Sequence, residues 1–301
     1  MILKNQKNMM NFRHVASLLF IIISLSSCGE IYDLNGFDWQ PDVPPSDSVF
    51  SREILILNLG DNLPEGHTPV DASDPLYFSL EKFSTVHLAY KTTDRWDLAF
   101  RGNSRSELSG NNGRATGLGY GSSAIGGMFV TDSPYDKITS IPDDSKFQAP
   151  GISGLDEIGE FGAPMGHVAY TFFGNMFRPD KVVGYLDNTY DPAVQLEASK
   201  YAHMLYALSD DFAKKYPVTI NGDFTKCRTI LLRTAAGNYA KVEILSYYRN
   251  TLDPREMNRG KGYAVSFRYM VVKADEKRFG FTPRRKAMTV NQTTKRVEIK
   301  P

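Results

Sequence analysis

The stretch APMGHVAYTFFGNMF, residues 163–177, places side chains that can ligate a metal beside flat aromatic rings. A thioether and an imidazole both serve in proteins as axial ligands of haem iron. Because side chains alternate along a strand, Met165 and His167 are expected on one face of it. The segment therefore favours a pocket for a flat, iron-containing ring. The alternative is core packing, in which a methionine among aromatic side chains simply fills space.

A second pair of potential ligands, His203 and Met204, lies in the stretch YAHMLYAL, residues 201–208. Apolar residues at a spacing of three to four, with an aspartate and a proline at the start, predict a helix over 191–213. In a helix, His203 faces solvent and Met204 borders the apolar stripe. In a strand, His203 shares a face with Leu205, and Met204 shares the other face with Tyr206. The two interpretations favour different ligands, and both stay open here.

The beginning of the chain has the features of an export signal. Lys4, Lys7 and Arg13 precede an apolar run of 11 residues, 15–25, which is too short to span a bilayer. Small residues then lead to Cys28. The ending LSSC resembles the bacterial lipobox, which implies cleavage of a signal peptide, residues 1–27, and attachment of acyl chains such as palmitate to Cys28. Several acyl chains would anchor the protein firmly to a membrane.

Charge and cysteine content exclude several classes of protein. Without residues 1–27 the chain has 32 Lys and Arg against 34 Asp and Glu, so no basic excess exists to bind nucleic acid. Cys227 is the only cysteine besides Cys28, which predicts no disulfide and a small buried thiol. The sequence contains no nucleophile elbow, zinc-protease helix or paired-cysteine motif, so we expect a protein that is not an enzyme.

The arrangement of apolar residues predicts a mainly β, antiparallel fold with one inserted helix at 191–213. A proline- and aspartate-rich tether, residues 28–50, is expected to precede a single domain, residues 51–301. In 95–100, Trp96, Leu98 and Phe100 are expected on one face. The glycine-rich segment 101–127 is predicted to be a mobile surface loop. Strands are expected at 52–59, twice within 75–90, at 95–100, 228–234, 239–248 and 262–274.

Five segments, taken in order, resemble the HmuY family of haem-binding lipoproteins over about residues 75–275. They are PLYFSLEKFSTVHL, RWDLAFRGNSRSELSGNNG, GGMFVTDSPYDKITSIPDD, CRTILLRTAAGNYAKVEILSYY and YAVSFRYMVV. The resemblance implies an HmuY-like antiparallel β fold and an outer-membrane lipoprotein, on the periplasmic side or at the cell surface. It also implies a haemophore, which captures haem for iron acquisition and hands it to an outer-membrane receptor.

In that family two axial ligands, His or Met, hold the iron from both sides of the ring. The first lies downstream of the Ile-Pro-Asp-Asp loop, where this chain has Met165 and His167. The second lies upstream of the last hairpin, where this chain has His203 and Met204. The alternative hypothesis is an HmuY-like lipoprotein that has lost haem ligation and binds a different ligand or a protein partner. A surface carbohydrate-active enzyme is a third hypothesis.

Overall fold

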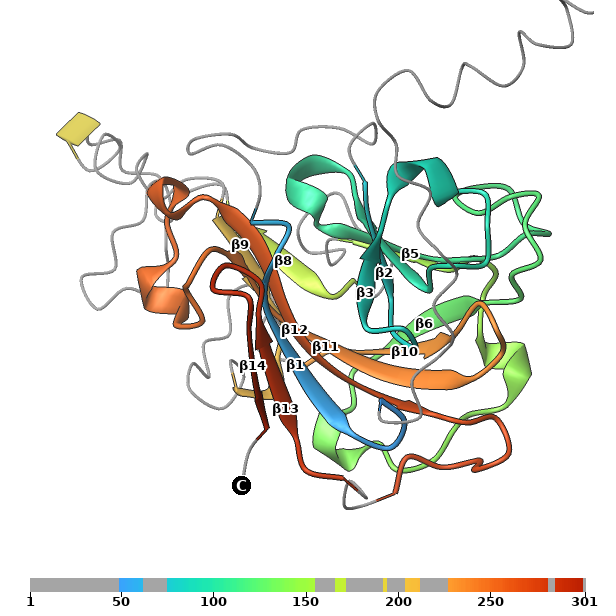
Figure 1. Cartoon of the computed structure of the whole chain (residues 1–301). Coiled ribbons are helices and arrows are strands. Elements are labelled where there is room, and N and C mark those ends of the chain that lie inside the picture. Colours follow the sequence, from blue (N-terminus) through green and yellow to red (C-terminus); the bar gives the residue numbers. More distant parts are fainter. Residues whose placement is uncertain are drawn as a thin grey trace, which may run out of the picture. The chain divides into compact units, whose positions relative to one another are not determined.

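The computed structural model describes residues 49–61, 75–154, 166–171, 192–193, 204–211, 227–280 and 285–299. All of them belong to one compact unit, Pro44–Pro301 (Figure 1). The signal peptide, Cys28 and the tether up to residue 48 lie outside the described residues. Within the described ranges, no helix is long and apolar enough to cross a membrane.

The largest element is a seven-stranded sheet in the order β14-β13-β1-β12-β11-β10-β6, called sheet A here. Its pairs are antiparallel except for β1 and β13, which run parallel (Figure 1). The strands are β1 (Glu53–Leu59), β6 (Gly127–Thr131), β10 (Thr229–Arg233), β11 (Tyr239–Tyr248), β12 (Tyr263–Val272), β13 (Met288–Asn291) and β14 (Arg296–Ile299).

A five-stranded sheet, called sheet B, has the order β3-β2-β4-β5-β7, and β8 pairs with β9 in a separate two-stranded ribbon. Their strands are β2 (Leu76–Ser79), β3 (Ser84–Val86), β4 (Leu98–Arg101), β5 (Glu107–Gly110), β7 (Ile152–Ser153), β8 (Val168–Thr171) and β9 (Met204–Ala207). Short 3-10 helices complete the described elements: η2 (Leu88–Tyr90), η3 (Asn103–Arg105), η4 (Tyr135–Lys137), η5 (Asp144–Lys146), η7 (Pro254–Glu256) and η8 (Arg259–Lys261).

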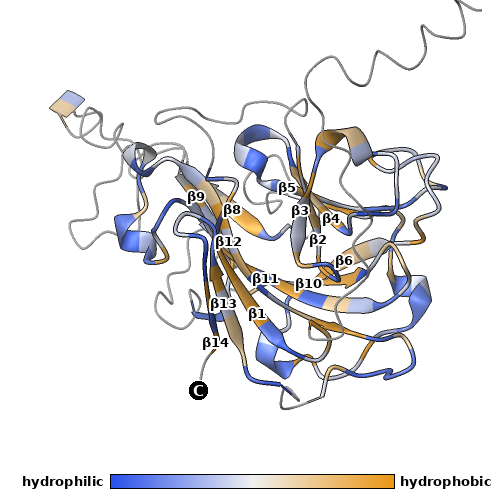
Figure 2. Ribbon diagram, viewed as in Figure 1, coloured by the Kyte–Doolittle hydropathy of each residue, from blue (hydrophilic) through white to orange (hydrophobic). Residues whose placement is uncertain are grey.

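Alternation along the strands of sheet A sorts the side chains onto two faces, and both faces are covered except at the edge strand β14. On the inner face, Ile54, Val242 and Phe267 join one core cluster with Phe78 and Leu98 of sheet B, and with residues of the β8–β9 ribbon. Figure 2 shows the resulting apolar stretches along β1, β10, β11 and β12. Burial of these side chains is the main stabilising term of the fold.

The outer face of sheet A has a smaller apolar cluster and a group of charged side chains. Met270 and Val272 of β12 pack there with Ile138 and Phe279, which come from two connecting segments. Because both faces of the sheet are covered at β10 and β12, these strands contain near-continuous buried runs instead of a simple polar alternation.

The predicted strands within 52–59, 75–90, 228–248 and 262–274 are confirmed. The predicted common face for Trp96, Leu98 and Phe100 is wrong for Trp96. Trp96 packs with Tyr77 and Ala99 in a separate cluster, because β4 begins only at Leu98 and the residues before it follow a different path.

The glycine-rich segment 101–127 was predicted to be a mobile loop, and the structure instead shows β5 and closely packed backbone there. A Cβ on Gly110 would lie 2.4 Å from the carbonyl oxygen of Pro150, and one on Gly126 would lie 2.4 Å from that of Asn111. These glycines therefore permit close approach of backbone segments.

The helix predicted over 191–213 is wrong at Met204–Ala207, although residues 210–211 beyond it are helical. Residues 192–193 are helical, whereas Met204–Ala207 forms β9, paired with β8. The strand interpretation therefore holds for this part of YAHMLYAL. The apolar side chains that suggested a helical stripe are explained by burial of both faces: Leu205, Tyr206 and Ala207 are all at most 2% exposed.

Two buried carboxylates, Glu81 and Asp97, connect sheet B to the turn between β10 and β11. Asp97 accepts hydrogen bonds from the backbone N–H of Ala235 at 2.9 Å and of Leu80 at 2.7 Å. Glu81 accepts from the hydroxyl of Thr234 at 2.5 Å and from the amide of Asn238 at 2.9 Å. Burial, together with the neighbouring Glu81, raises the pKa of Asp97 from 3.8 to about 7.

We predict that Glu81→Gln gains stability relative to the wild type as the pH rises from 4.5 to 7.5. Wild-type Asp97 retains a proton in the folded state that the unfolded chain releases, so its contribution is lost between about pH 4 and pH 7. Glutamine keeps the two accepted hydrogen bonds but removes the repulsion that raises the pKa of Asp97. In urea unfolding, the free energy of unfolding of the variant minus that of the wild type should rise by about 1–2 kcal/mol between pH 4.5 and 7.5. Glu256→Gln, an exposed site, is the control; a difference that does not vary with pH would contradict the prediction.

Candidate functional site

His167, the described member of the first pair of potential iron ligands, lies immediately before β8 and is 1% exposed. Its backbone N–H donates to the carbonyl of Gly154 at 2.9 Å, and its own carbonyl accepts from Leu208 N–H at 3.2 Å. The residue therefore continues the β8–β9 ladder by one position and ties the ribbon to the end of β7.

Both ring nitrogens of His167 are hydrogen-bonded inside the protein. Nδ1 lies 2.8 Å from the hydroxyl oxygen of Ser153, and Nε2 lies 2.6 Å from that of Tyr247. Burial lowers the pKa of His167 from 6.5 to about 3, so the ring is neutral, with one nitrogen donating and the other accepting. Iron ligation by His167 would require one of these two hydrogen bonds to break.

Tyr247 reaches His167 because of an irregularity in β11. The register between β11 and β12 shifts between Ile244 and Ser246 and again between Ser246 and Tyr248. As a result Tyr247 and its neighbour Tyr248 are both in the inner core, whereas strict alternation would place them on opposite faces. The hydroxyl of Tyr248 accepts from the backbone N–H of Leu205 at 2.9 Å, so both tyrosines attach the ribbon to sheet A.

The ribbon brings together the two segments that contain the candidate ligands. β8 pairs antiparallel with β9 from Val168 opposite Ala207 to Thr171 opposite Met204. His167 and Met204 are thus near opposite ends of a short ladder, separated by four residues or about 13 Å along it. Met165, His203 and the side chain of Met204 lie outside the described residues.

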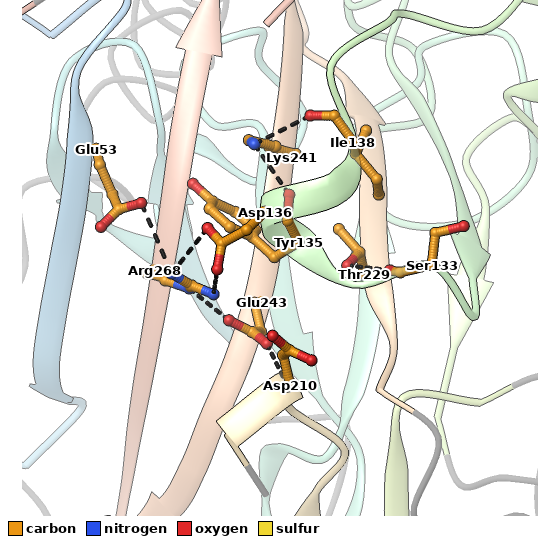
Figure 3. Close-up of polar contacts among 10 residues, drawn as sticks. All are labelled: Glu53, Ser133, Tyr135, Asp136, Ile138, Asp210, Thr229, Lys241, Glu243 and Arg268. Atoms are coloured by element: carbon orange, nitrogen blue, oxygen red, sulfur yellow. Dashed lines mark hydrogen bonds and ion pairs between the residues drawn. The ribbon is translucent and has the colours of Figure 1, made fainter. Parts of the chain in front are cut away.

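A cluster of charged residues on the outer face of sheet A was not predicted from the sequence (Figure 3). Arg268 of β12 is at its centre. Its guanidinium binds Glu243 through Nε, Asp136 of η4 at 3.1 Å and Glu53 of β1 at 3.7 Å. Glu243, 1% exposed, also accepts from the backbone N–H of Asp210 at 2.6 Å. The cluster therefore joins three strands to two connecting segments.

The ring of Tyr135 lies against two cations in this cluster (Figure 3). The guanidinium of Arg268 is 4.2 Å from the ring centroid, and Nζ of Lys241 is 4.3 Å from it. Nζ of Lys241 also donates to the carbonyls of Tyr135 at 3.0 Å and Ile138 at 3.1 Å. Burial lowers the pKa of Lys241, while hydrogen bonds to two carbonyls offset part of the cost of its charge.

This arrangement fastens the η4 segment to the sheet. Within the described ranges, no group of three or more His, Cys, Asp or Glu side chains could hold a metal ion. A signal for the cluster exists in the sequence: Lys241, Glu243 and Arg268 are charged residues within otherwise apolar strands. Their partners in 135–138, however, are about a hundred residues away.

Comparison with known proteins gives only distant structural likenesses. No family model matches the sequence, and no curated protein matches it. A crystal structure of a protein described as a lipoprotein, from Bacteroides fragilis NCTC 9343, is 17% identical. The match covers 67% of this chain and 87% of that one, with a TM-score of 0.23. These values are too low to transfer a ligand or a function from that protein to this chain.

We predict that His167→Gln is less stable than the wild type at pH 7 and that this difference shrinks in acid. The unfolded chain protonates His167 below about pH 6.5, whereas the folded protein keeps it neutral to about pH 3. The contribution of His167 is therefore full above pH 6.5 and lost as the pH falls. Urea unfolding should show the deficit of the variant narrowing by about 2–3 kcal/mol between pH 6.5 and 4.5. A deficit of His167→Gln that stays the same between pH 6.5 and 4.5 would refute the assignment.

We also predict that Lys241→Met destabilises the protein by about 1–3 kcal/mol, because two buried carbonyl groups lose their donor. Methionine nearly preserves the length and apolar stem of lysine, so the effect reports on the ammonium group. Lys146→Met, at an exposed position, is the control and should leave the unfolding free energy nearly unchanged. Equal unfolding midpoints for wild type and Lys241→Met would show that the ammonium group does not stabilise the attachment of the η4 segment.

Proposed function

We propose that this protein is a lipid-anchored binding protein of the bacterial outer membrane that captures haem and passes it to an outer-membrane receptor. The observation that carries the proposal is the β8–β9 pairing. It joins into one ribbon the strands Val168–Thr171 and Met204–Ala207, which adjoin the two segments that the resemblance to the HmuY family marks as the sources of the axial ligands. Binding and transfer of haem make no covalent bonds, so the protein needs no catalytic group.

The anchor in this proposal is Cys28, lipidated after removal of residues 1–27. The basic start, the short apolar run and the LSSC ending support it. Acyl chains on Cys28 and a proline-rich tether would hold the β domain close to the membrane, on its periplasmic side or at the cell surface.

The geometry of His167 narrows the candidate ligands. Since both of its ring nitrogens are engaged, we assign His167 a structural role, in which it fixes the start of β8. Met165 then becomes the candidate ligand from the first segment, and His203 or Met204 the candidate from the second. A set that contains at least one thioether would favour ferrous over ferric iron.

The engaged ring of His167 also supports a second candidate function. A lipoprotein with an HmuY-like fold that has lost haem ligation would bind a different ligand or a protein partner. In that case the buried histidine is a fixed part of the core, and the ribbon serves only to close the inner face of sheet A.

Haemin titration separates the two candidates. The mature chain carrying Cys28→Ser, which cannot be lipidated, is mixed with haemin, and visible spectra are recorded before and after reduction with dithionite. We expect sharp low-spin bands in the reduced state, lost in Met165→Ala and in one of His203→Ala and Met204→Ala. His167→Gln should keep those bands while lowering the unfolding midpoint.

His87→Ala, at an exposed histidine, is the matched control and should bind haem like the wild type. A spectrum identical to that of free haemin in both oxidation states would reject haem capture and leave the second candidate. Loss of the bands in a folded His167→Gln protein would show that His167 itself binds iron.

A further inference from the structure

The edge strand β14 exposes the continuation of the core face of sheet A. Ile54 and Ile56 of β1 are fully buried, and their neighbours Met288 and Val290 of β13 are 9% and 6% exposed. In the next strand, Ile299 lies opposite Met288 and Val297 lies opposite Val290. These two side chains are therefore on the same face, yet they are 57% and 55% exposed.

The two edges of sheet A differ in how they are closed. At the β6 edge, Met128 exchanges two backbone hydrogen bonds with Gln148, at 2.9 and 3.2 Å, which covers that edge. For β14, no strand or bridge other than β13 is paired with it among the described residues. Figure 1 places β14 at the margin of the sheet, beyond β13. An exposed edge with apolar side chains is a template for pairing with another strand.

The sequence of β14, Arg-Val-Glu-Ile, is complementary to itself when two copies run antiparallel. With a twofold axis through Val297, Val297 faces Val297 of the second copy, and each Arg296 faces Glu298 of the other. Opposite charges directly across two strands stabilise the pair, whereas like charges destabilise it. Centring the pair on Glu298 would instead oppose two glutamates and place Arg296 against Lys300. Of these two registers, the charges therefore favour the one centred on Val297.

We propose that β14 is a homodimerisation edge, at which two copies of this chain pair antiparallel about Val297 and extend sheet A across both molecules. The twofold arrangement makes the interface isologous, with the same strand contributed by each copy. The Val297 side chains of the two copies then meet on the core side of the joined sheets, with Ile299 of each copy beside them and opposite Lys295 of the other copy. A single short strand buries little area, so the contact is weak and reversible in solution. This inference does not depend on haem binding or on lipidation.

Cysteine crosslinking tests the register. In the mature chain carrying Cys28→Ser, Cys227 is buried, so an introduced thiol is the accessible one. Val297→Cys places two thiols directly opposite each other, whereas Glu298→Cys places them two residues out of register. We expect Val297→Cys to form an intermolecular disulfide at least about tenfold faster than Glu298→Cys under mild oxidation, because only directly opposed residues bring their Cβ atoms close enough.

Charge reversal tests the pairing without a covalent bond. Arg296→Glu places like charges opposite each other at both ends, so sedimentation velocity at increasing protein concentration should show a monomer where the wild type dimerises. The double variant Arg296→Glu with Glu298→Arg exchanges the charges and should restore the dimer. Both positions are exposed, so circular dichroism should confirm that every variant is folded.

Equal crosslinking rates for the two cysteine variants would overturn the proposed register. A wild-type chain that stays monomeric at every concentration, or a dimer unaffected by Arg296→Glu, would overturn the interface itself. Binding of the monomer to phospholipid vesicles through Val297 and Ile299, without dimer formation, would likewise reject a second copy as the occupant of this edge.

Discussion

The fold depends on covering both faces of the seven-stranded sheet A. On the inner face this is achieved by apolar side chains from sheet B and the β8–β9 ribbon, among which Phe78 packs against Phe267 at a centroid distance of 5.5 Å. On the outer face, one segment that contains η4 is fastened by charges. Adjacent residues of β12 show the division: Phe267 points into the apolar core, and Arg268 binds three carboxylates on the other side.

Covering the sheet so completely forces ionisable groups out of water, and each is accommodated in its own way. His167 stays neutral between two hydroxyl groups, with its pKa lowered to about 3. Lys241 donates hydrogen bonds to two backbone carbonyls, and Arg268 forms ion pairs with carboxylates. Asp97 instead has its pKa raised to about 7, first because it is buried and second because Glu81 adds negative charge. Burial disfavours the charged form in every case, and local partners decide how much of that cost remains.

Strand identities and the hairpin 228–248 could be predicted because apolar runs, β-branched residues and turn residues act locally. The details that failed are those set by distant contacts. Tyr247 and Tyr248 share the inner core only because the register of β11 shifts against β12. Met204–Ala207 has helical spacing of apolar residues but pairs with β8, so tertiary pairing outweighs the local pattern.

The same distinction explains why the candidate site was only partly predictable. A histidine beside methionine and aromatic residues has the composition of a haem pocket, and composition cannot reveal whether a ring nitrogen has a free lone pair. That depends on Ser153, which is 14 residues away, and on Tyr247, which is 80 residues away. A histidine that ligates iron needs one ring nitrogen without a hydrogen bond, whereas a structural histidine gains stability when both nitrogens are hydrogen-bonded. Since both nitrogens of His167 are filled by partners from two different sheets, its ring contributes to holding β7, the ribbon and β11 together. A haem or another molecule bound at this ribbon would therefore have to contact side chains other than that of His167.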